Sequence, residues 1–314
     1  MTTCSGFLLR VGIEGKTGGI YGPIYPGRSF EFIPIPETQL PNDCLNVGVL
    51  KQTRMNRYCQ LPLRHPYKSL RRLSDLLPVD YLMFRDNSHN IRVDYCIAPK
   101  LIPHDDPDFQ HKTFGDYWGM IPKDRLGLES YERDMLAQRG YVDLRSSIYV
   151  FFVTSLWSTQ RRWYSRNRPT YRQLKDEQQE KMRRSMYLTG YFSLEKIVDV
   201  GKLEGYENTL RVFRNNAEVR RRLQGNFHFK RHGLVDRSGK SMPKFDSNVV
   251  ILFGRPNRSK LLDHAIPLRK SSTLSEPNRL GNQLGLKVGD PMMGPRPLSG
   301  SQCKIALEAI RRLG

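Results

Sequence analysis

The chain lacks the sequence features of several protein classes. Its five cysteines, Cys4, Cys44, Cys59, Cys96 and Cys303, are odd in number and form no C-x-x-C pair, so neither a disulfide framework nor a cysteine zinc site is expected. No charged-then-apolar leader opens the chain, and no apolar run approaches the roughly 20 residues of a membrane span. These absences predict a soluble protein of the reducing cytoplasm, with no membrane partner.

Acidic residues are scarce relative to basic ones. The 314 residues include 51 Lys and Arg but only 31 Asp and Glu, which gives a formal net charge of +20 and a pI near 9.9. Such an excess favours a polyanionic partner, because phosphate contacts release counterions and the field steers association. Nucleic acid is the expected partner, although ribosome-bound and membrane-surface proteins share this charge. The 38% hydrophobic content is enough for a folded core.

The glycine-rich stretch near the N-terminus matches neither common nucleotide-binding loop. Residues 7–13 are a short apolar run that predicts a buried strand, and Gly15, Gly18 and Gly19 follow it. A phosphate loop needs Lys-Ser/Thr at a helix entry and a dinucleotide fingerprint needs G-x-G-x-x-G, and neither pattern occurs here. Because glycine lets a ligand approach the main chain, we expect a pocket rim here, followed by a second strand over residues 29–35.

Three blocks of the chain resemble one protein family. Residues 8–37 read LLRVGIEGKTGGIYGPIYPGRSFEFIPIPE, residues 104–116 include HDDPDF and TFGD, and residues 186–192 read MYLTGYF. These blocks are similar to the F-E-x-I-P-I-P-E, H-x-D-P-E-F…T-Y-G-D and later strand segments of the nucleotide modification associated domain family, type three. The chain departs from the family pattern at residues 144–147, where Gly-Asp is expected, and at Glu218, where histidine is more usual.

The resemblance implies a role in nucleotide or DNA base modification, with DNA and other modification-system proteins as partners and with the cofactor unknown. Polar residues in and beside the matching blocks are candidate catalytic groups, because an imidazole and carboxylates can exchange protons or ligate a divalent metal. They could equally cap turns, since Asp before Pro commonly starts one. These candidates are Glu14, His104, Asp106 and Asp116, of which His104 and Asp106 are expected in a proline-bounded loop.

Two basic segments are candidate nucleic-acid contacts. Residues 161–184 hold nine basic and three acidic residues, interleaved with Trp163, Tyr164 and Tyr171 and preceded by Trp157. This composition is typical of grooves that stack unpaired bases, with a solvated helix face as the alternative. Residues 204–224 predict one amphipathic helix with arginines on its far side. The candidate nucleic-acid-binding residues are Arg10, Gly18, Gly19, Arg161, Arg162, Trp163, Arg183, Arg184, Arg220 and Arg221. His228 and His232 would suit zinc only on a helix, and residues 227–230 alternate like a strand, so no metal site is predicted.

The remaining patterns predict a single α+β domain over residues 1–314. Strands are expected at 148–153, which should be central, and at 187–194 and 248–253, with a bulge or close backbone approach at Gly190. Helices are expected at 126–139, 173–186 and 259–266 and after a Ser301 cap, with a basic insertion at 44–101 and a Ser/Pro/Gly-rich segment at 271–301. The core should be a curved mixed sheet or a small PUA-like β-barrel with flanking helices, the latter by analogy of pattern.

Three functions remain open on these observations: an enzyme of nucleotide or DNA base modification, a non-catalytic reader of modified bases, and a basic structural subunit of a nucleoprotein complex. An enzyme requires the polar candidate set to converge within one pocket. A reader requires stacked aromatic side chains, and a structural subunit requires neither. The reaction type, the target base and the choice between DNA and RNA are not encoded in any pattern recognised above.

Overall fold

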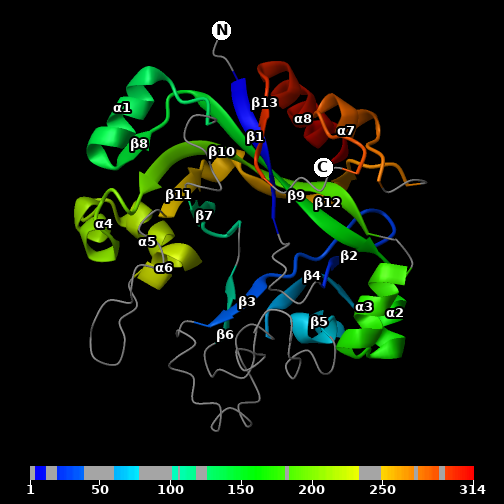
Figure 1. The fold of residues 1–314 in the computed structure, drawn as a ribbon. Helices are drawn as coiled ribbons and strands as arrows, with labels where there is room; N and C mark the ends of the chain where they lie inside the picture. The colour runs from blue at the N-terminus through cyan, green and yellow to red at the C-terminus, as the bar shows by residue number, and fades with distance from the viewer. Residues whose placement is uncertain are drawn as a thin grey trace.

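A nine-stranded mixed sheet with helices around it forms the body of the protein (Figure 1). The computed structural model describes residues 4–11, 20–38, 60–77, 101–104, 107–117, 126–180, 184–232, 249–271, 275–289 and 294–314. The α+β class expected from the sequence is confirmed. The path of hydrogen-bonded strands runs from β13 to β7 without closing, so the strands described here form an open sheet, and the barrel alternative is not confirmed.

Two long strands form the centre of the sheet. They are β9 (Ser147–Ser158) and β10 (Arg184–Asp199), which pair antiparallel, while β1 (Cys4–Arg10) lies parallel to β9 on its other side. Val150 and Phe152 pack into one buried cluster, whereas Phe151 packs into the cluster on the opposite face. This double-sided burial explains why residues 148–153 read as continuously apolar, and it confirms the expected central strand.

The other strands of this sheet extend the central group on both sides. Gly190 sits at a register shift in β10, where an added Cβ would lie 2.4 Å from Phe109 Cζ, so the predicted bulge and close approach are confirmed. The six remaining strands are β13 (Arg296–Leu298) beside β1, β2 (Gly22–Ile24) beside β9, β8 (Tyr141–Asp143), β11 (Val249–Gly254) and β12 (Lys260–Pro267) beside β10, and β7 (Thr113–Tyr117) beside β11.

Helices cover both faces of the sheet and its two ends (Figure 1). Leu136 of α1 packs on the Val150 side, and Ala306 and Ile310 of α8 pack on the Phe151 side. Among the described helices, none is long and apolar enough to cross a membrane. The helices are α1 (Ser130–Arg139), α2 (Arg161–Asn167), α3 (Tyr171–Glu180), α4 (Tyr206–Val212), α5 (Ala217–Gly225), α6 (Phe227–His232), α7 (Arg279–Gln283) and α8 (Gly300–Leu313).

Two short two-stranded sheets lie below the main sheet in Figure 1. One pairs β3 (Ile35–Thr38) with β6 (Leu101–His104), and the other pairs β4 (Pro62–Tyr67) with β5 (Leu70–Arg72), before a 3₁₀ turn at Leu73–Asp75. The described part of the predicted basic insertion is therefore ordered. Its Leu63, Leu70 and Leu73 are buried in one cluster with Trp157 of β9, Tyr164 of α2 and Leu174 of α3.

Several local predictions are wrong, and capping groups explain three of them. Residues 204–224 form two helices, because α4 ends at Val212 and Asn216 caps the start of α5, where its Oδ1 accepts from the Val219 amide. Residues 227–230 belong to α6 rather than a strand, with Asn226 Oδ1 accepting from Phe229 N. Ser299, not Ser301, caps α8, where it forms a capping box with Gln302.

Long-range pairing explains the other differences. Where a helix was expected over residues 259–266, the chain forms β12, because Leu261 and Ile266 pair with Gly190 and Leu188 of β10. The expected strand over residues 29–35 begins only at Ile35, where β6 supplies a partner. The Ser/Pro/Gly-rich segment contributes α7, β13 and the buried Leu284, Leu286 and Leu298 to the core.

Candidate functional site

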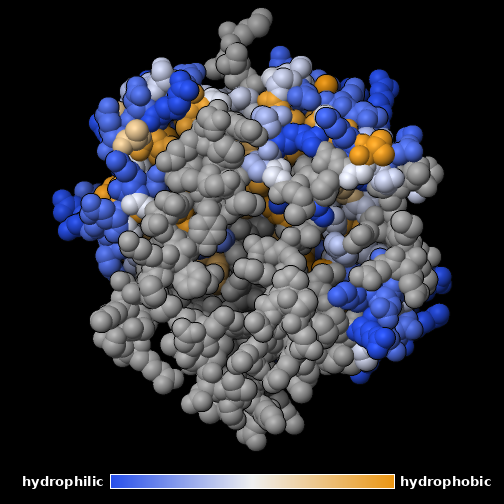
Figure 2. Space-filling model, viewed as in Figure 1, coloured by the Kyte–Doolittle hydropathy of each residue, from blue (hydrophilic) through white to orange (hydrophobic). Residues whose placement is uncertain are grey.

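A pocket of about 1550 Å³ opens between β2, the end of β9, α2 and the segment that follows β12. It is larger than the few hundred Å³ that hold one small ligand. Five described cationic side chains line it, namely Arg28, Arg162, Arg166, Arg269 and Lys270, together with the aromatic residues Tyr25, Trp163 and Tyr187. Glu177 is the one acidic residue among the described lining residues. Figure 2 shows hydrophilic residues over α2 and α3.

Two tight turns position the arginines at the rim of the pocket. β9 ends at Ser158, the Thr159 amide donates to Ile24 O of β2 at 3.0 Å, and the chain enters α2, on which Arg162 and Arg166 are exposed. On the facing side, Gly27 and Arg28 have φ of 84° and 70°, and Arg28 N donates to Tyr25 O at 2.9 Å. A left-handed arginine is strained, and such residues concentrate where a side chain must be presented.

A buried polar cluster stands behind one wall of the pocket. Glu31, 2% exposed, accepts from the amides of Arg64 at 2.9 Å and His65 at 2.7 Å. Burial raises the pKa of Glu31, although these amides and the Arg64 and Arg161 charges oppose the rise. The guanidinium of Arg161 lies 4.4 Å from the ring centroid of Tyr25.

Tyr25 links this cluster to the pocket, because it is 4% exposed and yet lines the cavity. Burial and the nearby Glu31 charge raise the pKa of Tyr25, so its phenol is a hydrogen-bond donor at neutral pH. Tyr25, Glu31, Arg64 and His65 do not stand out by composition, because they lie outside the basic and aromatic segment at residues 161–184. The available signal was the F-E-x-I-P-I-P-E match, in which Glu31 is the first carboxylate.

The aromatic residues beside the first basic segment divide into core and rim. Trp157 is fully buried and Tyr164 is 2% exposed, so neither ring is available for stacking on a base. Trp163 is half-buried and lines the pocket, with its ring centroid 5.0 Å from that of Trp157 in an edge-on arrangement. Of these three aromatic residues, only Trp163 lies at the pocket, and Trp157 and Tyr164 belong to the hydrophobic core.

The predicted catalytic set is only partly described. Glu14 and Asp106 lie outside the described residues. His104 ends β6 opposite Ile35, not in a loop, and Asp116 lies in β7 opposite Val250, but neither side chain is described. The convergence of these four groups stays a prediction.

The predicted nucleic-acid contacts are distributed over the whole fold. Arg161, Arg162 and Trp163 begin α2 at the pocket, whereas Arg220 and Arg221 lie on α5. Arg10 ends β1, half-buried, with Nη2 3.4 Å from Ser155 Oγ. Gly18, Gly19 and Arg183 lie outside the described residues. Arg184 is the first residue of β10, and its side chain is not described.

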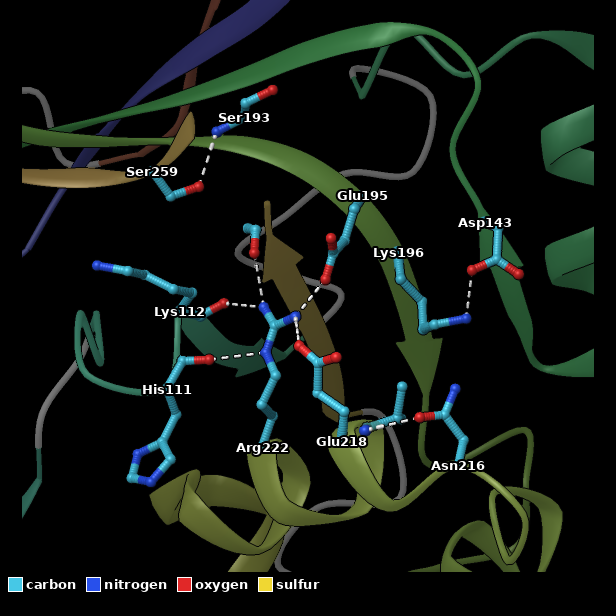
Figure 3. A network of polar contacts seen from close by, with 12 residues as sticks. His111, Lys112, Asp143, Ser193, Glu195, Lys196, Asn216, Glu218, Arg222 and Ser259 are labelled. Carbon is cyan, nitrogen blue, oxygen red and sulfur yellow. Dashed lines mark hydrogen bonds and ion pairs between the residues drawn. The ribbon is translucent and has the colours of Figure 1, made fainter. Parts of the chain in front are cut away.

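Arg222, which the sequence placed in the second basic patch, is 2% exposed and structural (Figure 3). Its Nε donates to His111 O at 2.8 Å, its Nη2 donates to Lys112 O at 2.9 Å and to Gly254 O at 2.6 Å, and its Nη1 pairs with Glu195. Glu218, at the family departure, lies 3.9 Å from the same Nη1. This side chain ties α5 to β10, β11 and the turn before β7.

The turn before β7 carries a second ordered polar pair. Asp108, 5% exposed, accepts from the amides of Gln110 and His111, and its Oδ2 lies 2.6 Å from His111 Nδ1. Among the described residues, no group of three or more His, Cys, Asp and Glu side chains could hold a metal. His228 and His232 do fall on a helix, α6, but the side chain of His232 is not described.

A family model described as nucleotide modification associated domain 3 matches residues 6–273. The match covers more than half of the chain. The chain belongs to the nucleotide modification associated domain 3 family. The resemblance inferred from the sequence blocks is confirmed, and most of the pocket, including Arg28, Arg162 and Arg269, lies within the family's matched region. Neither the curated proteins nor the solved structures contain a match to this chain.

Proposed function

We propose that this family member binds a nucleotide or single-stranded nucleic acid, with DNA favoured, in the α2 pocket as part of a nucleotide modification system. The observation that carries the proposal is the lining of the pocket, with five cationic side chains and three aromatic ones against one carboxylate. Cations hold phosphates, while aromatic faces accept any unstacked base, which is the combination found in single-strand binding grooves.

The exposed arginines of α2 contribute the electrostatic part of this binding. Arg162 and Arg166 are one helical turn apart and both line the pocket, so they can contact successive phosphates of one strand. Trp163 and Tyr187 supply the apolar faces, and both are half-buried rather than fully exposed. A partly buried ring is held in place before the base arrives, which lowers the entropy cost of stacking.

The enzymatic form of the proposal assigns the chemistry to Glu14, His104, Asp106 and Asp116, with other proteins of the modification system as partners. A reader of modified bases is the second candidate function, and the half-buried Trp163 and Tyr187 at the pocket favour it. The two forms share the same binding pocket. They differ in whether Asp106→Asn and His104→Ala abolish modification in cells while leaving nucleic-acid affinity unchanged.

The binding proposal is tested by charge reversal with a matched control. The double variant Arg162→Glu/Arg166→Glu alters two exposed arginines of the pocket, and Arg311→Glu/Arg312→Glu alters two exposed arginines of α8 that do not line it. Both variants change the net charge equally. Fluorescence anisotropy with a labelled single-stranded oligonucleotide should show at least a tenfold loss of affinity for the first and a much smaller loss for the second. Equal losses, or no binding by the wild type at low salt, would refute the proposal.

A further inference from the structure

The floor of the α2 pocket contains a buried hydroxyl whose hydrogen-bonding capacity is unused. Ser185 of β10 is 7% exposed, lines the pocket, and its Oγ has no hydrogen-bond partner among the described residues. A buried hydroxyl without a partner costs about 1–3 kcal/mol, and nearly all such groups in folded proteins are paired. A ligand in the pocket would supply the missing partner.

A buried arginine lies across the strand pair from this hydroxyl. Tyr187 of β10 faces Pro267 of β12, and Leu268 N donates to Met186 O at 2.9 Å, so the continued antiparallel register brings Ser185 opposite Arg269. Arg269 is also 7% exposed and lines the pocket, and its Nη1 is fixed by the carbonyl oxygen of Ser275. Its guanidinium is therefore held in position before any ligand arrives.

The third polar group of the floor is the phenol of Tyr187, two residues along β10 on the same face as Ser185. Burial raises the pKa of Tyr187, with the Arg28 charge opposing, so the phenol is protonated at neutral pH. A serine hydroxyl, a guanidinium and a phenol can all donate hydrogen bonds, and Glu177 is the one carboxylate among the described residues that line the pocket.

A cluster of donors selects its ligand by charge and by acceptor number. The edge of a nucleobase presents donors and acceptors side by side, whereas a phosphate presents only acceptor oxygens and carries negative charge. Guanidinium groups match phosphate geometry with two parallel N–H bonds, and hydroxyl donors complete its coordination. The exposed Arg28, Arg162 and Arg166 at the rim add further positive charge.

We propose that Ser185, Arg269 and Tyr187 form a phosphate-binding subsite at the floor of the pocket. This inference rests on the proposed function and specifies which part of the nucleotide enters first. The phosphate reaches the floor, and the base remains nearer Trp163 at the rim. The group is either the terminal phosphate of a nucleotide or strand end, or a phosphodiester of the backbone, and both present the same acceptor oxygens.

The experiment is calorimetric titration of the whole protein with inorganic phosphate, a deoxynucleoside and its 5′-monophosphate. The wild type should bind the monophosphate at least tenfold more tightly than the nucleoside. Ser185→Ala should reduce that ratio by three- to tenfold without weakening nucleoside binding. Ser193→Ala is the matched control, because Ser193 lies on the same strand, is 3% exposed and does not line the pocket.

Two results would overturn the subsite. One is equal wild-type affinity for nucleoside and monophosphate, and the other is a Ser185→Ala variant that loses both ligands in parallel. Either result leaves the proposed function standing if the α2 charge reversal still weakens oligonucleotide binding, so the two failures are distinguishable. Oligonucleotides with a 5′-phosphate or a 5′-hydroxyl then separate the sources, since a terminal-phosphate site prefers the former and a backbone site binds both equally.

Discussion

Two arginine-rich regions of the chain look alike in sequence and differ in structure. In the region around α5, Arg222 is buried and all of its nitrogen atoms have partners, three of them being backbone carbonyl oxygens (Figure 3). On α2, Arg162 and Arg166 are exposed at a pocket, and the Ser185 hydroxyl that lines this pocket has no hydrogen-bond partner among the described residues. All of these arginines carry the same charge. A structural arginine differs from one available to a ligand in that its nitrogen atoms already have hydrogen-bond partners within the protein.

The largest expected effect is the loss of the Arg222 network. Arg222→Ala removes the guanidinium that donates to three backbone carbonyl oxygens and pairs with Glu195, so we expect a destabilisation of about 3–5 kcal/mol by urea unfolding. Arg221→Ala removes the exposed neighbouring charge and should change stability by less than about 0.5 kcal/mol. If the two variants are equally stable, Arg222 does not hold the turn before β7 in place, and the comparison fails.

The buried carboxylate of Glu132 is a second charged group whose hydrogen-bond partners all lie within the protein. Glu132 of α1, 1% exposed, accepts from the Arg145 and Ser146 amides and from the Ser146 hydroxyl, in the segment that departs from the family pattern. Burial alone would raise the pKa of Glu132, but the hydrogen bonds from Ser146, Glu129 and Arg145 outweigh it and lower the pKa. Glu132→Gln should therefore destabilise the protein by about 2 kcal/mol at pH 7.

The pH dependence of this effect has a defined sign. A carboxyl with a lowered folded-state pKa contributes stability above its ordinary pKa, near 4.3, and that contribution is lost as the pH falls through the folded-state pKa. The difference between wild type and Glu132→Gln, measured by urea unfolding at several pH values, should shrink below about pH 4. A difference that stays constant down to pH 3 would contradict the proposed role of the charge.

Loss of the Trp163 ring should weaken the binding of single-stranded nucleic acid. Trp163→Ala should weaken single-stranded binding by about 1–2 kcal/mol and double-stranded binding by less, because only unpaired bases stack on the ring. Trp163 also packs against Trp157 and Tyr164, so the variant's thermal unfolding must be measured alongside. Equal losses on both substrates in a folded variant would indicate a surface that contacts phosphates only.

The smallest expected effect concerns two arginines of α5, of which Arg221 is exposed and Arg220 is half-buried. Arg220 and Arg221, predicted from sequence to bind nucleic acid, line no part of the described pocket. For Arg162→Glu/Arg166→Glu, loss of two phosphate contacts should lower the magnitude of the slope of log affinity against log salt by about 1.4. Arg220→Glu/Arg221→Glu should lower it by less. A larger reduction of the salt slope for the α5 variant would indicate that α5, rather than α2, contacts the nucleic acid.

The sequence predicted those parts of the fold that depend on local pattern. The central strand, the bulge at Gly190 and the helix ended by Gly140 are all found, because apolar runs, glycine geometry and helix capping act over a few residues. The strand β12 was missed because its conformation is fixed by pairing with β10, which lies some seventy residues away.

The candidate site was predictable to a smaller extent. Composition identified Arg162 and Trp163, but Tyr25, Ser185 and Arg269 come from three distant segments that no periodicity connects. Composition also could not separate the buried Arg222 from half-buried Arg220 and exposed Arg221. Burial of an arginine depends on carbonyl oxygens and carboxylates, which are contributed here by β10, β11 and the turn before β7.

Amide hydrogen exchange with and without a single-stranded oligonucleotide tests the comparison most directly, because it reports on both regions in one wild-type sample. The account predicts slower exchange on binding in residues 158–167, 185–187 and 267–271, which surround the pocket, and a much smaller change in α5. Protection confined to α5, with none around the pocket, would contradict the assignment of the α2 pocket as the ligand-binding region.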